Sequence, residues 1–92
     1  MRYIVCYDIT DNRVRYRLVK LLESLGRRLE KSVFECIMHP RDMIVLHDRI
    51  MNIIEVADGD CCHMFHVCQN CEDYSYVIGN DYEQGFGELM VV

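Results

Sequence analysis

The hydrophobic pattern of the chain begins with an unbroken apolar run that ends at a carboxylate. Residues 3–10 read YIVCYDIT, and the apolar part of this stretch does not alternate with polar residues. A short, continuous run of β-branched and aromatic residues is typical of a strand buried on both faces. Asp8 ends the run, so a rigid strand would fix the place of its carboxylate. The alternative is that Asp8 caps the following turn, although Thr10, Asp11 and Asn12 already offer that chemistry.

The next segment has the spacing of an amphipathic helix. Its apolar residues recur at the period of one helical face: Val14, Leu18, Leu21, Leu22 and Leu25. Asp11 or Asn12 can cap its start, and Gly26 its end. Another face is basic, with Arg13, Arg17 and Lys20 in a row and Arg15 and Tyr16 beside it. Such a row is commonly only a solvated face. However, its N-terminal end lies next to Asp8 in the sequence, and an arginine guanidinium can donate two hydrogen bonds to one phosphate.

Residues 27–54 predict further β structure and a second helix. Strand formers gather at Val33, Phe34, Cys36 and Ile37, and either two short strands or one bent strand would satisfy the pattern. His39 and Pro40 interrupt it, because the residue before proline disfavours helical geometry. We expect Asp42 to cap the second helix. Apolar residues at helical spacing predict its buried side: Met43, Leu46, Ile50, Ile53 and Ile54.

The last third of the chain predicts shorter elements. A turn at residues 57–60 leads into a third main strand at residues 61–68. Residues 74–78 predict another short strand. The tail, residues 81–92, ends in four apolar residues, and it either lacks order or pairs with the edge of a sheet.

This order of elements predicts a two-layer α+β domain with the ferredoxin-like βαββαβ arrangement. We expect residues 1–79 to form the domain and residues 80–92 to form a C-terminal strand or tail associated with a dimer. A chain of 92 residues buries only a small core. A homodimer that shares strands would relieve that limit.

The charge is unevenly distributed along the chain. The net charge is −5, but residues 1–31 carry +4 and residues 32–92 carry −9. This asymmetry predicts a basic working face whose binding to a polyanion is local and salt-sensitive. The composition is that of a soluble globular protein, and we find neither a membrane-length apolar run nor a signal peptide. We therefore expect a cytoplasmic protein with its six cysteines reduced.

Three segments together resemble one known family. They are YDIT at residues 7–10, DNRVRYRLVKLLESLG at residues 11–26 and RRLEKSVFE at residues 27–35. The chain is similar over essentially its whole length to CRISPR-associated protein Two, a small ferredoxin-like endonuclease of the CRISPR adaptation module. The YDI and KSVFE motifs at this spacing are specific as a pair. Glu30 departs from the family pattern, because members often carry glutamine there, and its carboxylate would weaken local phosphate contact.

The resemblance implies a site shared between two copies of the chain. It implies a homodimer that exchanges C-terminal strands, with Mg²⁺ or Mn²⁺ between the protomers and Asp8 as metal-site and catalytic residue. Residues matching the family's nucleic-acid contacts are Tyr7, Arg15, Arg17, Arg28 and Phe34. Family members are described as nucleases on single-stranded RNA or double-stranded DNA. They are also described as a non-catalytic bridge between dimers of the CRISPR integrase, CRISPR-associated protein One. We expect the endonuclease function, with the structural bridge as the alternative, and the two functions can coexist. The residues do not choose between RNA and DNA, because phosphate contacts carry no base information.

A second group of candidate metal ligands lies near the late strand. Cysteines and histidines gather there, with a CxxC formed by Cys68 and Cys71. Zinc bound by His66, Cys68 and Cys71 is one interpretation, and buried or turn cysteines are the other. Because alternate residues of a strand face opposite sides, a single tetrahedral site would need a bend or help from a second copy. A Cys–His nucleophilic pair lacks any accompanying acyl-transfer motif.

Overall fold

The structure is a computed structural model that describes residues 1–68 and residue 78. It contains a strand, a helix, a hairpin, a second helix, a short 3₁₀ turn and a final strand. In chain order these are β1 (Arg2–Asp8), α1 (Asn12–Leu25), β2 (Arg27–Glu30), β3 (Val33–Ile37), α2 (Pro40–Ile53), η1 (Val56–Asp58) and β4 (Cys61–Val67). Apart from residue 78, the strand expected at residues 74–78 lies outside the described residues, and so does the tail at residues 80–92.

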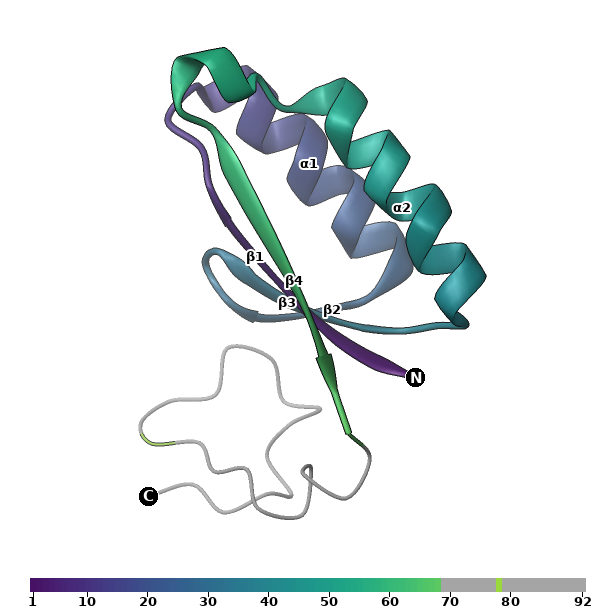
Figure 1. Cartoon of the computed structure of the whole chain (residues 1–92). Coiled ribbons are helices and arrows are strands. Elements are labelled where there is room, and N and C mark those ends of the chain that lie inside the picture. Colours follow the sequence, from purple (N-terminus) through teal and green to yellow (C-terminus); the bar gives the residue numbers. More distant parts are fainter. Residues whose placement is uncertain (69–77, 79–92) are drawn as a thin grey trace.

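The strands form one antiparallel sheet in the order β2-β3-β1-β4. Both helices lie on the same side of this sheet (Figure 1). This arrangement is the expected ferredoxin-like two-layer fold. The segment after α1 forms two short strands, which settles the alternative that the sequence left open. Among the described residues, neither helix has the length and apolar character that crossing a bilayer requires.

β1 lies in the middle of the sheet and is buried on one face. Tyr3, Val5 and Tyr7 belong to the core beneath the helices, whereas Ile4 and Cys6 are half-buried on the opposite face. The prediction of a strand buried on both faces is therefore wrong for the single chain. The apolar run places apolar side chains on both faces of β1, but no element of the described chain covers the face opposite the helices.

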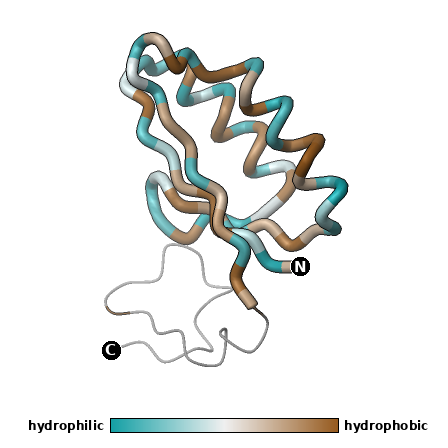
Figure 2. Tube along the Cα trace, in the orientation of Figure 1, coloured by the Kyte–Doolittle hydropathy of each residue, from teal (hydrophilic) through white to brown (hydrophobic). Residues whose placement is uncertain are grey.

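α1 buries Leu18, Leu21 and Leu22 of the predicted stripe, whereas Val14 is half-buried and Leu25 is exposed. Both helices show brown and teal segments in alternation along their length (Figure 2). Gly26 follows the helix, and its N–H donates to Leu22 O. A Cβ at this glycine would lie 2.3 Å from Glu35 O and 2.7 Å from Cys36 Sγ. Gly26 is thus required for the close approach of the chain to β3, and its extended φ of −156° does not demand glycine.

α2 begins three residues earlier than expected. Its N-cap is His39, whose Nδ1 accepts the N–H of Arg41 at 3.2 Å, and Pro40 is the first helical residue. The prediction that Asp42 caps this helix is wrong. Proline at the first helical position has a suitable φ and needs no N–H partner. The same proline that ends the strand therefore starts the helix, and Asp42 lies in its first turn.

The helix-free face of the sheet combines a buried ion network with exposed apolar side chains. Glu35 is buried, and its two carboxylate oxygens accept hydrogen bonds from Arg2 and Arg27. The register places Ile37 opposite Arg2 and Phe65 opposite Ile4, out of phase with the core residues. Ile37 and Phe65 are 69% and 53% exposed. This face is the least covered apolar surface of the sheet.

Candidate functional site

Asp8 is the last residue of β1, and its side chain is exposed. β1 is hydrogen-bonded to β3 on one side and to β4 on the other, and Asp8 lies opposite Cys61. A strand paired on both sides holds its end in a defined position. Among the described residues, the Asp8 carboxylate accepts no hydrogen bond and forms no ion pair.

Asp11, and not Asp8, caps α1. Its Oδ1 accepts the backbone N–H groups of Arg13 at 2.8 Å and Val14 at 3.0 Å. These two bonds lower the pKa of the Asp11 carboxyl below its ordinary value, and the bond from Val14 has the larger effect. The alternative that Asp8 serves as the cap is therefore wrong, and its carboxylate is available to a ligand.

An open cleft of ≈ 670 Å³ joins Asp8 to basic side chains from three other segments. Its lining residues are Tyr7, Asp8, Ile9, Arg15, Arg28, Lys31 and Ser32. Arg15 comes from α1, Arg28 from β2, and Lys31 from the turn between β2 and β3. The cleft thus gathers four predicted site residues, including one carboxylate and two guanidinium groups. A phosphodiester is the kind of ligand that this charge pattern suits.

The turn between β2 and β3 is tied to the end of β1. Tyr7 Oη donates a hydrogen bond of 2.7 Å to Lys31 O, and the Tyr7 backbone N–H donates to Ser32 O at 3.1 Å. Arg28 Nη2 donates to the same Lys31 O at 2.7 Å. Because these bonds join the two walls of the cleft, they fix the position of the basic turn relative to Asp8.

Phe34 supports the cleft from below. Its side chain is 0% exposed, and Arg28 Cζ lies 5.5 Å from the centroid of its ring. A cation over an aromatic face is attracted by the ring quadrupole. Phe34 has no exposed surface to offer a nucleic acid in this structure. The direct nucleic-acid contact that the resemblance implied for Phe34 therefore stays a prediction, and in this structure its ring contacts Arg28.

Arg15 and Arg17 lie on different flanks of α1. Residues two apart on a helix are separated by about 200° around its axis. Arg15 Nη1 donates to Ile9 O at 3.0 Å, and its Nη2 contacts Asn12 Oδ1, so the guanidinium is fixed to the loop that follows Asp8. Arg17 is exposed and does not line the cleft. The two arginines that the resemblance grouped are therefore on separate surfaces.

Lys31 and Ser32 also line the cleft, although neither was predicted as a site residue. Both lie in the turn between two strands, within the KSVF motif. The sequence indicates a tight turn at this motif. It does not indicate that the turn packs against the end of β1, which is what places Lys31 and Ser32 in the cleft.

The zinc prediction is not resolved by the described residues. Within residues 1–68, no three His, Cys, Asp or Glu side chains are placed to share a metal ion. His66 and Cys68 are exposed, and Cys71 lies outside the described residues. Zinc bound by His66, Cys68 and Cys71 stays a prediction.

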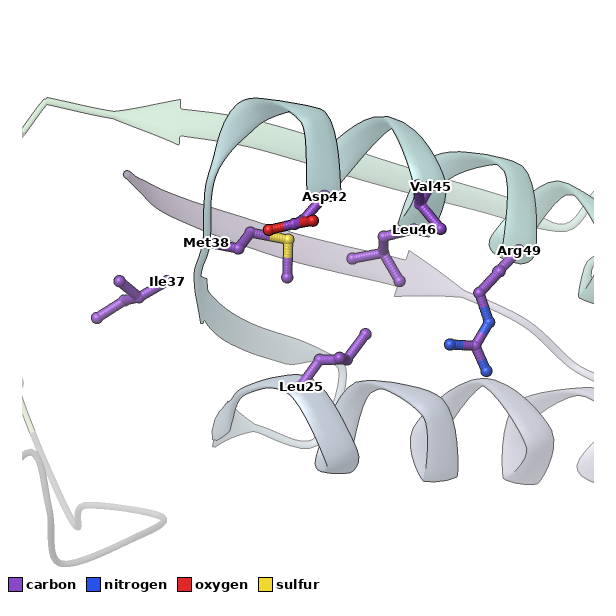
Figure 3. A pocket seen from close by; sticks show the side chains of 7 residues that line it. All are labelled: Leu25, Ile37, Met38, Asp42, Val45, Leu46 and Arg49. Carbon is purple, nitrogen blue, oxygen red and sulfur yellow. The ribbon is translucent and has the colours of Figure 1, made fainter.

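A second hollow, of ≈ 290 Å³, lies between the end of α1 and the first turns of α2 (Figure 3). Leu25, Val45 and Leu46 are among its apolar lining residues, and Asp42 and Arg49 are its two charged ones. In Figure 3 the guanidinium of Arg49 extends toward α1. With one charge of each sign, this hollow does not suit a polyanion, so the Asp8 cleft is the candidate site.

Comparison with known proteins identifies related chains. The family model described as CRISPR associated protein Cas2 matches residues 1–74. A protein of Archaeoglobus fulgidus named "CRISPR-associated endoribonuclease Cas2 1" is 37% identical over 81 residues, which cover 87% of this chain and 85% of the relative.

Two solved structures have the same fold. The crystal structure of Streptococcus pyogenes Cas2 superposes with a TM-score of 0.77 at 24% identity, covering 86% of this chain and 100% of that one. A chain of the structure named "Partial Cas6-RT-Cas1--Cas2 complex" gives a TM-score of 0.70 at 26% identity, covering 80% of each chain. Since the family model spans most of the sequence, the chain belongs to the CRISPR-associated protein Cas2 family.

Proposed function

We propose that this protein is a divalent-metal-dependent endonuclease of CRISPR spacer acquisition that cleaves phosphodiester bonds in single-stranded RNA or double-stranded DNA. The observation that carries the proposal is the exposed Asp8 carboxylate, which has no partner among the described residues and lies in a cleft with Arg15, Arg28 and Lys31. The name of the Archaeoglobus fulgidus relative, an endoribonuclease, supports the same activity.

The active form that we propose is a homodimer. Ile37 and Phe65 leave apolar surface exposed on the helix-free face of the sheet. A second copy packed there would remove this surface from water at about 25 cal/mol per Å². A two-fold axis would also bring two Asp8 carboxylates into one assembly.

The Asp8 cleft of one chain fits only part of a metal site. The described residues of one chain hold no cluster of three potential ligands, and Asp8 is the only carboxylate in the cleft. Mg²⁺ usually keeps several waters and binds through one or two carboxylates. One Asp8 from each protomer therefore fits Mg²⁺ or Mn²⁺ shared across the dimer axis. Such an ion, when bound, supplies a Lewis acid for the phosphate and a source of hydroxide.

The chain's own residues bind and position the substrate in this proposal. Arg15 and Arg28 donate hydrogen bonds to phosphate oxygens from opposite walls of the cleft, and Lys31 adds a third positive charge. Each guanidinium is already fixed by a hydrogen bond to a backbone carbonyl, so little ordering is required on binding. Their positive charge stabilises the phosphorane-like transition state more strongly than the substrate. No histidine or glutamate lines the cleft within the described residues, which fits slow turnover.

The alternative function is a structural bridge that binds the DNA backbone and joins dimers of the integrase Cas1. The related structure named as a complex of Cas1 and Cas2 favours this second candidate. Phosphate contacts carry no base information, so a bridge and a nuclease need the same basic residues. Only the nuclease requires the Asp8 carboxylate.

The two candidate functions are separated by one substitution. Wild type and Asp8→Asn are incubated with single-stranded RNA and with double-stranded DNA in Mg²⁺ or in EDTA, and DNA capture with the cognate Cas1 is measured in parallel. We expect Mg²⁺-dependent cleavage by wild type, no cleavage by Asp8→Asn, and capture by both. Cleavage that persists in Asp8→Asn would overturn the nuclease site. Capture without any wild-type cleavage would select the bridge.

A further inference from the structure

One basic surface of α1 takes no part in the Asp8 cleft. Arg13, Arg17 and Lys20 recur at i, i+4 and i+7, so they form a row on the exposed side of the helix. The row lies on the side of α1 opposite the core residues Leu18 and Leu22 and away from Arg15, which lines the cleft.

An exposed aromatic ring lies beside this row. Tyr16 is 63% exposed, and helical spacing makes Arg13 and Lys20 its neighbours, three residues before and four residues after it. The Lys20 ammonium lies 5.3 Å from the centroid of the Tyr16 ring. The ring is therefore held next to a positive charge and is open to solvent over most of its surface.

The cations around Tyr16 are available to a ligand. Among the described residues, the side chains of Arg13 and Arg17 form no hydrogen bond or ion pair. Lys20 forms an exposed ion pair with Glu23 at 3.7 Å, and such pairs are weak. Glu23 is the only acidic residue in α1, against four basic ones, in a chain whose net charge is −5.

We propose that Tyr16, with Arg13, Arg17 and Lys20, forms a second nucleic-acid surface that binds single-stranded nucleic acid. An unpaired base stacks on the Tyr16 ring, and the row of cations binds the flanking phosphates. Non-specific single-strand sites combine these two features, because every base has a π-face and every nucleotide a phosphate. A base inside a duplex is already stacked on both sides, so the ring discriminates in favour of unpaired strands.

This inference rests on the proposed role in nucleic-acid chemistry, but it places strand binding and cleavage on different flanks of α1. Arg13 and Lys20 are about 10 Å apart along the helix axis, at ~1.5 Å per residue. That length accommodates a short segment of strand lying along α1. The surface would hold a single-stranded substrate or the unpaired end of a duplex while the Asp8 cleft contacts another part of it.

The test measures binding by fluorescence anisotropy in EDTA, so that metal-dependent cleavage does not interfere. The probes are labelled oligothymidine, oligouridine, an abasic strand of the same length and a blunt duplex. The variants are Tyr16→Leu, which keeps an apolar side chain without a ring, and Tyr16→Phe, which keeps the ring. Arg41→Gln, an exposed charge change on α2, is the control. Tyr16 is exposed, so none of these changes disturbs the core.

We expect Tyr16→Leu to weaken binding of oligothymidine by about 5- to 150-fold, the effect of one lost base stack. Tyr16→Phe and Arg41→Gln should bind as wild type does, and the duplex should bind Tyr16→Leu unchanged. Wild type should bind the abasic strand as weakly as Tyr16→Leu binds oligothymidine. Equal losses for oligouridine and oligothymidine would show that Tyr16 binds single-stranded RNA and DNA alike. A loss confined to one of these two probes would show that Tyr16 prefers that nucleic acid.

Three results would overturn the inference: binding of both oligothymidine and oligouridine by Tyr16→Leu at wild-type strength, an equal loss for the duplex, or full-strength binding of the abasic strand by wild type. The same anisotropy series in Asp8→Asn separates this inference from the proposed activity. Tyr16-dependent binding without cleavage by wild type would contradict the nuclease alone. Cleavage with Tyr16-independent binding would contradict the second surface alone.

Discussion

Tyr7 and Arg28 donate hydrogen bonds to one oxygen, the backbone carbonyl of Lys31, each at 2.7 Å. Tyr7 belongs to β1 and Arg28 to β2, which is at the far edge of the sheet. The shared acceptor draws the β2–β3 turn against the end of β1. The Asp8 cleft thus has its shape because a core tyrosine and a surface arginine hold the same turn.

Tyr7→Phe should loosen this turn while leaving the core filled. The ring stays buried, but the hydroxyl bond to Lys31 O is lost. We expect a loss of about 0.5–1.5 kcal/mol in the free energy of unfolding, measured by urea denaturation. Cleavage should fall in parallel, since Lys31 and Arg28 lose their fixed position. A variant as stable and as active as wild type would show that the hydroxyl bond does not position the turn.

Arg15→Ala should reduce cleavage more than Arg17→Ala does. Arg15 lines the Asp8 cleft and is fixed to Ile9 O, whereas Arg17 lies on the other flank of α1. Single-turnover rates with saturating enzyme isolate the chemical step from binding. We expect a large loss of rate for Arg15→Ala and a small one for Arg17→Ala under these conditions. Equal losses of cleavage rate would show that Arg15 and Arg17 act on the substrate from one surface.

Glu35→Ala should destabilise the fold strongly. Glu35 and Arg2 are both buried, so removing the carboxylate leaves an uncompensated positive charge in the sheet. Breaking a buried ion pair in this way costs about 3–5 kcal/mol. The matched control is Glu30→Ala at an exposed position, for which a change within about 0.5 kcal/mol is expected. Chemical denaturation of both variants measures the difference in the free energy of unfolding. A small loss for Glu35→Ala would mean that the Arg2 guanidinium becomes solvated in the variant.

Alkaline pH should weaken the fold through the buried thiol of Cys36 and the half-buried thiol of Cys62. Burial raises the pKa of Cys36 and of Cys62 to about 11 from 9.0. Above pH 9 the unfolded chain therefore releases these protons while the folded chain keeps them, and stability falls as the pH rises toward about 11. The double variant Cys36→Ala/Cys62→Ala should have a flatter pH dependence of unfolding free energy than wild type. An identical slope would show that these thiols titrate alike in both states.

Local patterns predicted the elements that depend on local physics. The leucine spacing of α1 and the capping of its start by Asp11 follow from helical period and side-chain reach. Asp8 was placed at the end of a strand because the apolar run stops there. The order of the elements then indicated the ferredoxin-like fold, which the sheet order confirms.

The features that the sequence did not predict depend on tertiary contacts or on competing local rules. The Lys31 turn enters the cleft only because Tyr7 and Arg28 hold it there. His39 competes with Asp42 as a cap, and the proline between them decides in favour of His39. The separation of Arg15 from Arg17 follows from their spacing on a helix, but the family resemblance grouped them.

The central claim is that two Asp8 carboxylates, one from each protomer, hold one divalent ion for cleavage. Dimers reassembled from wild type and Asp8→Asn in varied proportions test it directly through the initial rate of cleavage in Mg²⁺. If each active site requires both carboxylates, the rate should follow the square of the wild-type fraction, since mixed dimers are inactive. A rate that declines linearly with the wild-type fraction would show that a single Asp8 suffices, and it would contradict the shared metal site.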